Sequence, residues 1–509
     1  MKLKAKVVKG GLHLSMGQVA MQASSFIRNI ILARLISPAD FGIAAIFGMS
    51  LQMIEVLSNV ATEMLLVQAP DGDDERLQGT AQLIRAARGV GNGLIIFTLA
   101  WPLAKLFGVP QATWAFRCLA LVPLSRGLFH LDMSRLQRHM RFAPSAISDA
   151  GSSWFATIVI VPLAFYLRDY SAMLWALVIQ VAGASIASHL LAERRYSWSW
   201  DRAHWRRMVS FGWPLMINGI LMLGIFEGDR LIIGSSRRLF PMSSFSLTDL
   251  GVYSAAFSLT MAPTLFIANI SASLFLPLLS TVQEIASQFQ RRYVACLEAV
   301  SLAASVISIL FITAGGTLVR MIYGPRYAGA AAVIGWLGAM WALRIVRVAP
   351  TLAAMALGDT KNTMIANFAR SLALIGMAIA AATGMGLVWI AISGFAGEAL
   401  ALTASVWRLQ RVNSITPRLF AKPMTVVSLG MAVSFAAAWW LSSTPIGAFA
   451  AWFGCTVLIV ATMFAVFHGL RQDVWSLVFK SRNPGADVEA PEQAAPEEVG
   501  ATEEVRSSV

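Results

Sequence analysis

Charged residues, cysteines and histidines are all scarce in this chain of 509 residues. Only 13% of the residues are charged against 57% hydrophobic, which excludes an ordinary soluble domain. The three cysteines, Cys118, Cys296 and Cys455, are scattered without metal-ligand spacing, which argues against a disulfide framework or a zinc site. The six histidines are equally isolated, so no metal is expected, and the absence of a Walker A motif argues against direct use of ATP.

Long apolar stretches take the place of the missing charge, and the mean hydropathy is +0.65. A membrane span needs about 20 mostly apolar residues. We therefore expect an all-α, polytopic membrane protein with about 14 transmembrane helices. The expected spans lie near residues 11–34, 41–67, 80–107, 112–134, 144–167, 171–192, 208–234, 250–280, 292–321, 327–357, 362–383, 386–408, 424–443 and 446–469.

The distribution of basic residues predicts the orientation. Lys2, Lys4, Lys6 and Lys9 precede the first span, and the Lys and Arg residues of the later loops are concentrated on the same side. Cytoplasmic loops carry such an excess, so both termini are expected in the cytoplasm. The net charge of +13 is spread over short loops and spans, so no nucleic acid is expected as a partner.

Two short motifs recur and indicate an internal repeat. The segment Ala39–Phe47 is echoed by Thr248–Phe257, and Leu106–Pro110 is echoed by Met321–Pro325. Transporters are often built from such repeats, with the cargo site at the repeat interface. We therefore expect two repeat lobes of about six helices each, an N-terminal lobe in residues 1–205 and a C-terminal lobe in residues 206–415. Two further helices, spans 13 and 14, are expected in residues 416–475, and a disordered acidic cytoplasmic tail in residues 476–509.

Arginines inside the expected spans are the most informative residues. An ionised side chain at bilayer depth costs roughly 2.5–3.5 kcal/mol on insertion scales, so it normally faces a wet cavity or a partner. Several such arginines predict a water-filled, cationic cavity that binds anionic cargo. The candidates are Arg28, Arg126, Arg344, Arg347 and Arg370. Snorkelling is the alternative for Arg28, and an internal acid such as Glu398 or Glu298 could pair with Arg344 and Arg347. Arg85 and Arg88 lie near a span end and are interpreted as lipid-headgroup contacts.

Carboxylates within the spans are the second set of candidates. Glu55 is expected to form a gating salt bridge or a proton or sodium coupling site, whereas Glu398 is expected to pair structurally. Asp229 is interpreted as an outer-gate residue, and its pairing with Arg28 is a hypothesis. Asp40 and Asp249 precede spans and are expected to be helix N-caps.

Three segments resemble the polysaccharide-biosynthesis flippases of the multidrug/oligosaccharidyl-lipid/polysaccharide exporter superfamily. They are Arg34–Gly42, Asp229–Gly234 and Asp249–Phe257, and the resemblance covers about residues 10–470. It implies a non-enzymatic flippase that moves undecaprenyl-diphosphate-linked oligosaccharide to the periplasmic leaflet by alternating access. The products would serve exopolysaccharide, capsule or O-antigen synthesis. It also implies membrane lipids, a polysaccharide polymerase and a chain-length regulator as partners, and it supports a cargo-facing role for Arg28.

Two alternatives stay open. A cation-coupled multidrug exporter of the same fold would favour acidic residues over arginines in its cavity. A membrane glycosyltransferase or polysaccharide polymerase would need a sizeable external loop, whereas the longest external loop expected here is about Ser235–Asp249.

Overall fold

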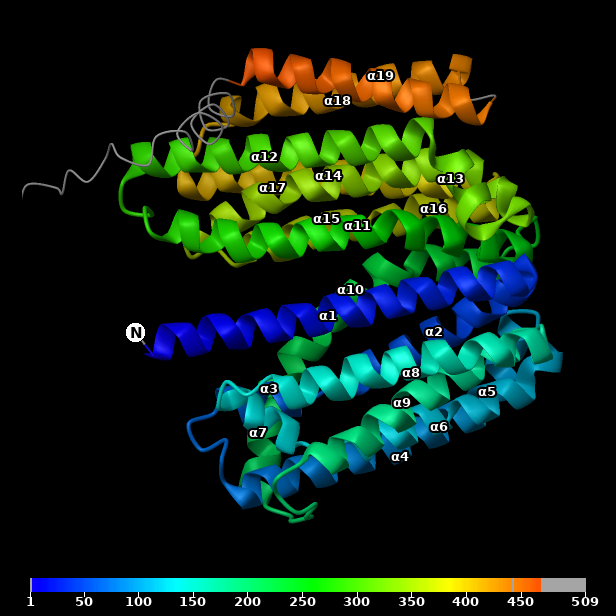
Figure 1. Ribbon diagram of the computed structural model, residues 1–509, viewed down its shortest axis with the longest axis vertical. Coiled ribbons are helices and arrows are strands. Elements are labelled where there is room, and N and C mark those ends of the chain that lie inside the picture. The colour runs from blue at the N-terminus through cyan, green and yellow to red at the C-terminus, as the bar shows by residue number, and fades with distance from the viewer. Residues whose placement is uncertain (1, 442–443, 468–509) are drawn as a thin grey trace, which may run out of the picture.

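The computed structural model describes residues 2–441 and 444–467, with side chains from residue 17 onward, and all regular elements in these ranges are helices (Figure 1). The elements of the first half are α1 (Lys2–Leu35), α2 (Pro38–Ser58), α3 (Thr62–Gln68), α4 (Glu75–Leu106), η1 (Pro110–Ala112), α5 (Thr113–Leu119), α6 (Leu121–Gly127), α7 (Asp132–Arg138), α8 (Ala143–Leu167) and α9 (Ser171–Leu191). Those of the second half are α10 (Arg202–Leu239), α11 (Leu247–Ser280), α12 (Ala286–Thr313), α13 (Gly315–Tyr323), η2 (Pro325–Ala330), α14 (Ala331–Ala356), α15 (Lys361–Ser371), α16 (Ala373–Ala382), α17 (Leu387–Asn413), α18 (Arg418–Leu441) and α19 (Pro445–Val466).

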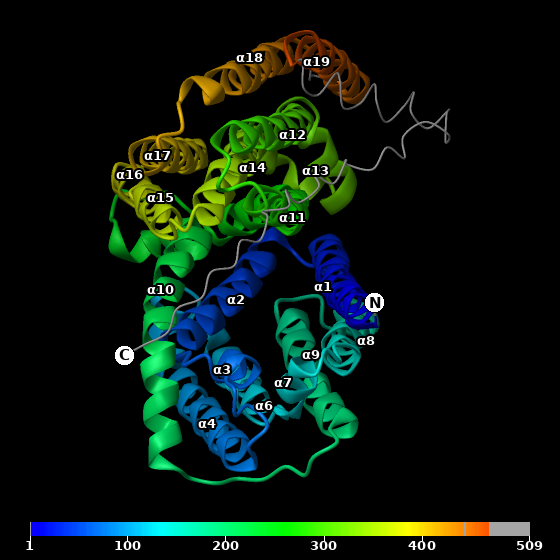
Figure 2. The same cartoon turned by 90° about the vertical axis from the view of Figure 1, so that its left-hand side faces the viewer.

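The helices form two groups (Figures 1 and 2). The first group contains α2–α9, with α1 packed on α8, and the second contains α11–α17, with α18 and α19 on its outer side. Helix α10 contacts α2, α3 and α4 of the first group as well as α11, α15 and α16 of the second. The predicted boundary between residues 205 and 206 falls near the start of this shared helix, so it stays a prediction.

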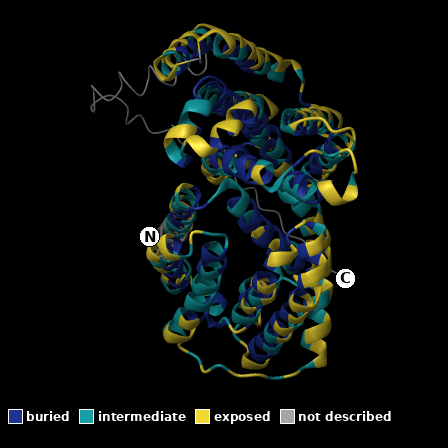
Figure 3. Ribbon diagram, turned by 90° about the vertical axis from the view of Figure 1, so that its right-hand side faces the viewer, coloured by how far each residue is buried: buried dark blue, intermediate teal, exposed yellow. Residues whose placement is uncertain are grey.

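The outer faces of the helices are apolar. Figure 3 shows buried residues concentrated inside the two groups and exposed residues on their outer faces. Large hydrophobic side chains are among the exposed ones, such as Ile158, Leu190 and Trp439. A water-soluble protein buries such residues, whereas a bilayer accepts them on the surface.

Twelve helices of the described ranges are long and apolar enough to cross a membrane. The expectation of an all-α, polytopic membrane fold is therefore confirmed, but the number 14 is not. The expected spans 11–34 and 112–134 are missing from the twelve. Helix α1 covers the first but carries many polar residues, and the second is divided among α5, α6 and α7. Pro123 contributes to this division because it has no N–H to donate to the preceding turn.

Helices α2 and α11 begin with the same local structure. Ser37 caps α2 and accepts a hydrogen bond from the amide of Asp40 (3.1 Å), while Ser246 caps α11 and accepts one from the amide of Asp249 (3.2 Å). The prediction that the two aspartates are N-caps is therefore wrong by three residues. A serine hydroxyl is short enough to reach back to the third helical amide, and Asp249 completes the capping box by accepting from the amide of Ser246.

The starts of α2 and α11 touch each other through two glycines. A Cβ atom at Gly42 would lie 2.2 Å from the carbonyl oxygen of Leu247, and one at Gly251 would lie 1.8 Å from that of Pro38. Only glycine permits this approach of backbone to backbone. We call this contact the glycine contact.

Side chains around the glycine contact tie the groups together at the same end. Arg34 donates hydrogen bonds to the carbonyl oxygens of Met321 and Ile322, at 2.7 Å for Ile322. The rings of Phe41 and Tyr327 meet edge to face at 6.0 Å. The two groups are thus in contact where α1 ends and α2 begins.

Candidate functional site

A cavity of about 620 Å³ lies within the first helix group. Its walls come from α1–α4, α6–α9 and the connections between them, so its lining residues fall between Met21 and Ser185. Serine and glutamine side chains line much of it, together with Asn59 and Thr62. A space of this size, lined by polar groups between membrane-spanning helices, is where water and a polar cargo can be held.

Six charged side chains line the cavity, and their formal charges balance. The cations are Arg85, Arg88 and Arg126, and the anions are Glu55, Glu63 and Asp149. Arg126 forms an ion pair with Glu55, and Arg85 forms one with Glu63. The cavity is therefore formally neutral when all six groups are ionised.

The arginines are positioned by a close crossing of α4 and α6. A Cβ atom at Gly89 would lie 2.6 Å from the Cα atom of Gly127 and from the carbonyl oxygen of Pro123, so the two helices meet where only glycine fits. Arg85 and Arg88 lie on α4 within one turn of this crossing, and Arg126 lies beside it on α6. The crossing therefore concentrates three guanidinium groups on one wall.

Arg85 and Arg126 differ in their freedom. The Arg85 side chain is only 7% exposed, donates to the carbonyl oxygen of Arg126 at 2.9 Å and lies 4.8 Å over the ring of Phe129. The Arg126 side chain is 43% exposed, and its hydrogen bond to Glu55 engages one terminal nitrogen. Of these two arginines, Arg126 is thus the one that presents free N–H groups to the cavity.

Two lining residues overturn an interpretation made from the sequence. Arg85 and Arg88 were expected at lipid headgroups, but both line the cavity, and Arg88 donates to the amide oxygen of Asn59 at 3.1 Å. Their spacing of three residues on one helix face was the available signal. Sequence reasoning also missed Glu63 and Asp149.

Arg28 lies beside the cavity rather than among its lining residues. Its side chain is buried and donates to the amide oxygen of Gln180 at 2.6 Å, and Gln180 lines the cavity. Asp229 lies in α10 and accepts a hydrogen bond from the hydroxyl of Tyr253 at 2.8 Å. The hypothetical pairing of Arg28 with Asp229 is not present among the described residues.

The remaining candidates are gathered in the second helix group, around Glu398. This carboxylate is fully buried and accepts hydrogen bonds from Arg347 at 2.6 Å and from Arg370 at 2.5 Å. A terminal nitrogen of Arg344 lies 3.9 Å from the same carboxylate, and its guanidinium lies 4.9 Å over the ring of Phe226. The structural pairing expected of Glu398 is confirmed, and these three arginines do not line the cavity.

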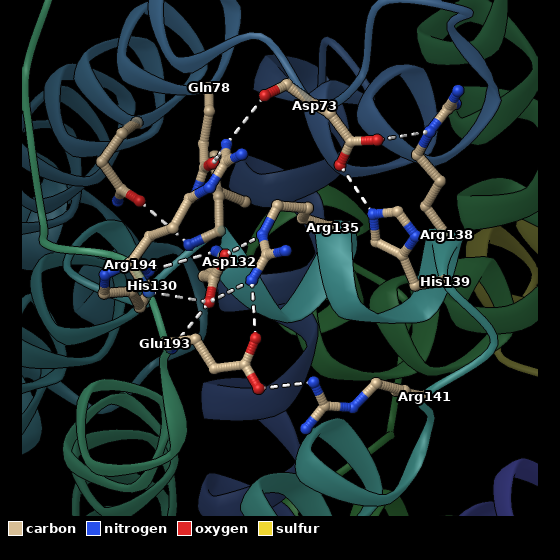
Figure 4. Close-up of polar contacts among 12 residues, drawn as sticks. Asp73, Gln78, His130, Asp132, Arg135, Arg138, His139, Arg141, Glu193 and Arg194 are labelled. Atoms are coloured by element: carbon tan, nitrogen blue, oxygen red, sulfur yellow. Dashed lines mark hydrogen bonds and ion pairs between the residues drawn. The ribbon is translucent and has the colours of Figure 1, made fainter.

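Helix α7, which contributes three residues to the cavity wall, belongs to a network of polar contacts. Figure 4 shows this network. Buried Asp132 binds Arg135 and accepts hydrogen bonds from the amides of Glu193 (2.8 Å) and Arg194 (3.2 Å). Glu193 in turn pairs with Arg135 and Arg141. Hydrogen bonds from Arg141 and Arg135 lower the pKa of the Glu193 carboxyl below its ordinary value. This network joins α7 to the segment that leads from α9 to α10.

A second part of the same network joins α7 to the loop before α4. His139 bonds to the carboxylate of Asp73 at 2.8 Å, and Arg138 approaches it at 3.5 Å. Arg194 donates to the carbonyl oxygen of Asp73 at 2.8 Å. Since Met133, Ser134 and Gln137 of α7 line the cavity, the network fixes one of its walls.

The comparisons with known proteins agree with this fold. Residues 31–332 match the family described as "Polysaccharide biosynthesis protein". The succinoglycan biosynthesis transport protein ExoT of Rhizobium meliloti (strain 1021) is 26% identical over 327 residues, which is 62% of this chain and 60% of that protein. The alignment therefore spans less than two thirds of this relative.

Two solved transporters have a similar fold. The lipid II flippase MurJ, in an inward closed conformation, aligns with a TM-score of 0.68 and 12% identity over 91% of this chain and 99% of its own. An inward-facing multidrug resistance transporter of the MATE family and the MOP superfamily aligns with a TM-score of 0.60 and 12% identity over 80% of this chain and 98% of its own.

Proposed function

The chain belongs to the polysaccharide biosynthesis protein family, and on that premise we propose that it is a flippase for undecaprenyl-diphosphate-linked oligosaccharide repeat units in the bacterial inner membrane. The repeat units would supply exopolysaccharide, capsule or O-antigen synthesis. Its transport relative serves succinoglycan biosynthesis, which is in keeping with such a cargo. A polysaccharide polymerase and a chain-length regulator are the proposed downstream partners.

The observation that carries the proposal is the exposed guanidinium of Arg126 in a polar cavity between membrane helices. Its side chain is 43% exposed, and Arg85 and Arg88 line the same cavity. Planar guanidinium groups bind phosphate oxygens through paired, charge-assisted hydrogen bonds. A diphosphate placed against Arg126 would thus recover the hydration it loses on leaving the headgroup layer, while the prenyl chain stays in lipid.

The proposed orientation puts both termini in the cytoplasm. The end of the molecule where Arg34 and the glycine contact join the two groups is then periplasmic. The cavity end framed by α7 is cytoplasmic, so cargo would enter from that side. Separation of the two groups at the glycine contact would release the cargo to the periplasmic leaflet by alternating access. The roles proposed from the sequence for Arg28, Glu55 and Asp229 remain part of this proposal.

A cation-coupled multidrug exporter is the second candidate, because three carboxylates line the same cavity. Cationic cargo or a coupling proton or sodium ion would bind to Glu55, Glu63 or Asp149. The similar fold of the MATE transporter is compatible with this function. The two candidate functions differ in the sign of the charge on the cargo, so a transport assay distinguishes them.

The test is deletion of the gene in its host, followed by measurement of surface polysaccharide and of the sidedness of lipid-linked oligosaccharide. Return of the wild-type gene should restore both, whereas Arg126→Ala should restore less than about a tenth of the polymer, because loss of a charge-assisted contact costs about 1.5–3 kcal/mol. Arg117→Ala is the matched control, since Arg117 is an exposed membrane arginine of α5 outside the cavity.

Repeat units trapped in the cytoplasmic leaflet of the deletion strain would support flipping. Normal polysaccharide together with altered sensitivity to cationic drugs would contradict it and favour the exporter. Equal loss in Arg126→Ala and Arg117→Ala would contradict the assignment of the cavity.

A further inference from the structure

The ion pairs in the cavity pose a physical question. The proposed cargo is an anion, yet in the structure Arg126 and Arg85 are already paired with Glu55 and Glu63. An anionic cargo must therefore compete with a carboxylate of the protein itself. The geometry of the two pairs decides which carboxylate that is.

The Arg126–Glu55 pair is the one that cargo can reach. Its side chains are 43% and 20% exposed, so the guanidinium faces the cavity. In the other pair the guanidinium is enclosed: Arg85 is 7% exposed and is held by the carbonyl oxygen of Arg126 and the ring of Phe129. A phosphate entering the cavity therefore competes with Glu55 for Arg126.

The pairs around Glu398 show what a permanent ion pair looks like in this protein. There the carboxylate is 0% exposed, and Arg347 and Arg370 are 6% and 5% exposed. Both oxygens of Glu398 accept hydrogen bonds. Glu55, in contrast, uses one carboxylate oxygen on Arg126, and its other oxygen, although buried, has no hydrogen-bond partner. The Glu55 carboxylate is thus only half satisfied in its present position.

A second arginine lies near Glu55, beyond its partner Arg126. A small recess adjoining the cavity is lined by Glu55 together with Arg88, Arg126 and Asn92. The Arg88 guanidinium has only the neutral amide oxygen of Asn59 as a hydrogen-bond acceptor among the described residues. A carboxylate displaced from Arg126 can therefore turn toward Arg88 without becoming an isolated charge.

We propose that Glu55 is an internal anion that occupies the place of the cargo phosphate on Arg126 when the flippase is empty, and that cargo displaces it toward Arg88. The inference rests on the proposed function and adds a specific step to it. An unpaired arginine within the membrane is unfavourable in free energy. The empty protein therefore needs a counter-charge while it returns to the conformation that accepts cargo. Glu55 supplies that counter-charge, and because the pair is partly exposed, its attraction is weak enough to be exchanged.

The test is binding of undecaprenyl diphosphate to the full-length purified protein in lipid nanodiscs. Glu55→Gln removes the competing charge and keeps the shape, so it should bind the probe about fivefold more tightly, the effect expected from a partly exposed ion pair. Its transport rate in proteoliposomes should nevertheless fall, because the empty protein now returns with an uncompensated Arg126.

Asp149→Asn is the matched control. Asp149 is another carboxylate that lines the cavity, without an ion pair in the described part of the chain, so its replacement removes a cavity carboxylate without freeing Arg126. Its effect on affinity should be smaller than that of Glu55→Gln. In the double variant Glu55→Gln/Arg126→Gln the gain in affinity should disappear, since the freed cation is gone.

Each outcome has a defined meaning. Affinity unchanged or reduced in Glu55→Gln, or raised equally in Asp149→Asn, would overturn the internal-anion proposal and leave the flippase function standing. Failure of wild type and all variants to bind the probe would overturn the proposed function and this inference with it. If Glu55→Gln does not fold, Glu55→Asp, whose shorter side chain weakens the contact with Arg126, should give a smaller gain in affinity, and no gain would overturn the proposal.

Discussion

Arginine side chains lie in two different electrostatic surroundings in this protein. Around Glu398, two of them are enclosed and satisfied by one carboxylate, whereas Arg126 borders a cavity and keeps free N–H groups. The guanidinium group is the same in both places, but it can exchange its carboxylate partner for another anion only where the protein does not enclose it. Removing one member of a buried ion pair lowers the free energy of unfolding by several kcal/mol, whereas removing one member of an exposed pair lowers it little.

The first prediction concerns Glu398. Glu398→Ala should lower the free energy of unfolding by about 3–5 kcal/mol, because Arg347 and Arg370 would remain buried without a counter-charge. Thermal unfolding in detergent, followed by tryptophan fluorescence, measures the change. Glu193→Ala, which removes an exposed partner, is the control and should have a far smaller effect. Similar losses in the two variants would contradict this account.

Single residues also show what the sequence could reveal about the site. The sequence showed that several arginines and Glu55 lie within the expected spans, because a charged residue is easily recognised inside an apolar segment. It could not show which face of a helix turns to the cavity. Arg344 was therefore expected in the cavity but lies beside Glu398, and Arg85 was expected at lipid headgroups but lines the cavity. Asp149 escaped notice although Ser145, Asp149 and Ser152 recur at helical spacing along one face of α8.

At the scale of elements, the glycine contact between α2 and α11 has a direct test. Gly251→Ala places a Cβ atom 1.8 Å from the carbonyl oxygen of Pro38, so the two helix starts must move apart. A cysteine introduced as Leu247→Cys in a cysteine-free background should then react several-fold faster with an impermeant maleimide. Gly48→Ala in α2 is the control, because a Cβ atom there meets nothing within 4 Å. Unchanged labelling in Gly251→Ala would refute the contact.

The segment between α9 and α10 should loosen in acid. The hydrogen bonds from Arg141 and Arg135 lower the pKa of the Glu193 carboxyl. The ionised carboxylate therefore stabilises the folded segment above the ordinary carboxyl pKa of about 4.3, and this stabilisation is lost as the pH falls below that value. Hydrogen exchange of the Glu193 and Arg194 amides, corrected for the intrinsic pH dependence, should be protected at pH 7 and less so in acid. Glu193→Gln should remove this protection at pH 7. The exposed Glu75, changed to Gln, is the control and should leave protection intact.

Element boundaries show where sequence reasoning fails. The long apolar helices were predictable because length and hydropathy suffice to define them. The segment 112–134 was expected as one span, but a proline and several polar side chains divide it into short helices, and composition alone does not reveal where a helix breaks. The caps were misplaced for a related reason, since Ser37 and Asp40 are both good capping residues and only the geometry separates them.

For the whole molecule, the repeated sequence motifs predicted equivalent positions but not their contact. The segments around Gly42 and Gly251 lie at the same place in each of the two expected repeats, and the structure brings these two places against each other. The joint between the groups thus includes two segments that share a sequence motif and a serine N-cap. Contacts between separate groups depend on packing that no single segment encodes, so the sequence could not show this.

The proposed movement of the two groups against each other can be tested by blocking it covalently. In a background without native cysteines, Arg34→Cys and Met321→Cys place thiols on the two groups where the Arg34 side chain now meets the Met321 backbone. A reducible bifunctional thiol reagent about as long as the arginine side chain that it replaces should cross-link the pair and stop transport, and reductant should restore it. A pair within the first group, Asp73→Cys with His139→Cys, is the control and should leave transport running. Transport by the Arg34/Met321 cross-linked protein would contradict alternating access.

The balance of charges in the cavity has a consequence for energetics. With three guanidinium groups and three carboxylates all ionised, the empty cavity carries no net charge, so in the proposed cycle its return would be insensitive to the membrane voltage. The loaded site carries the charge of the cargo alone. An inside-negative potential favours outward movement of an anion by about 2.3 kcal/mol per elementary charge per 100 mV. The diphosphate of the proposed cargo would thereby also let the resting voltage of the cell draw it outward, in an electrogenic cycle whose current follows the charge of the cargo.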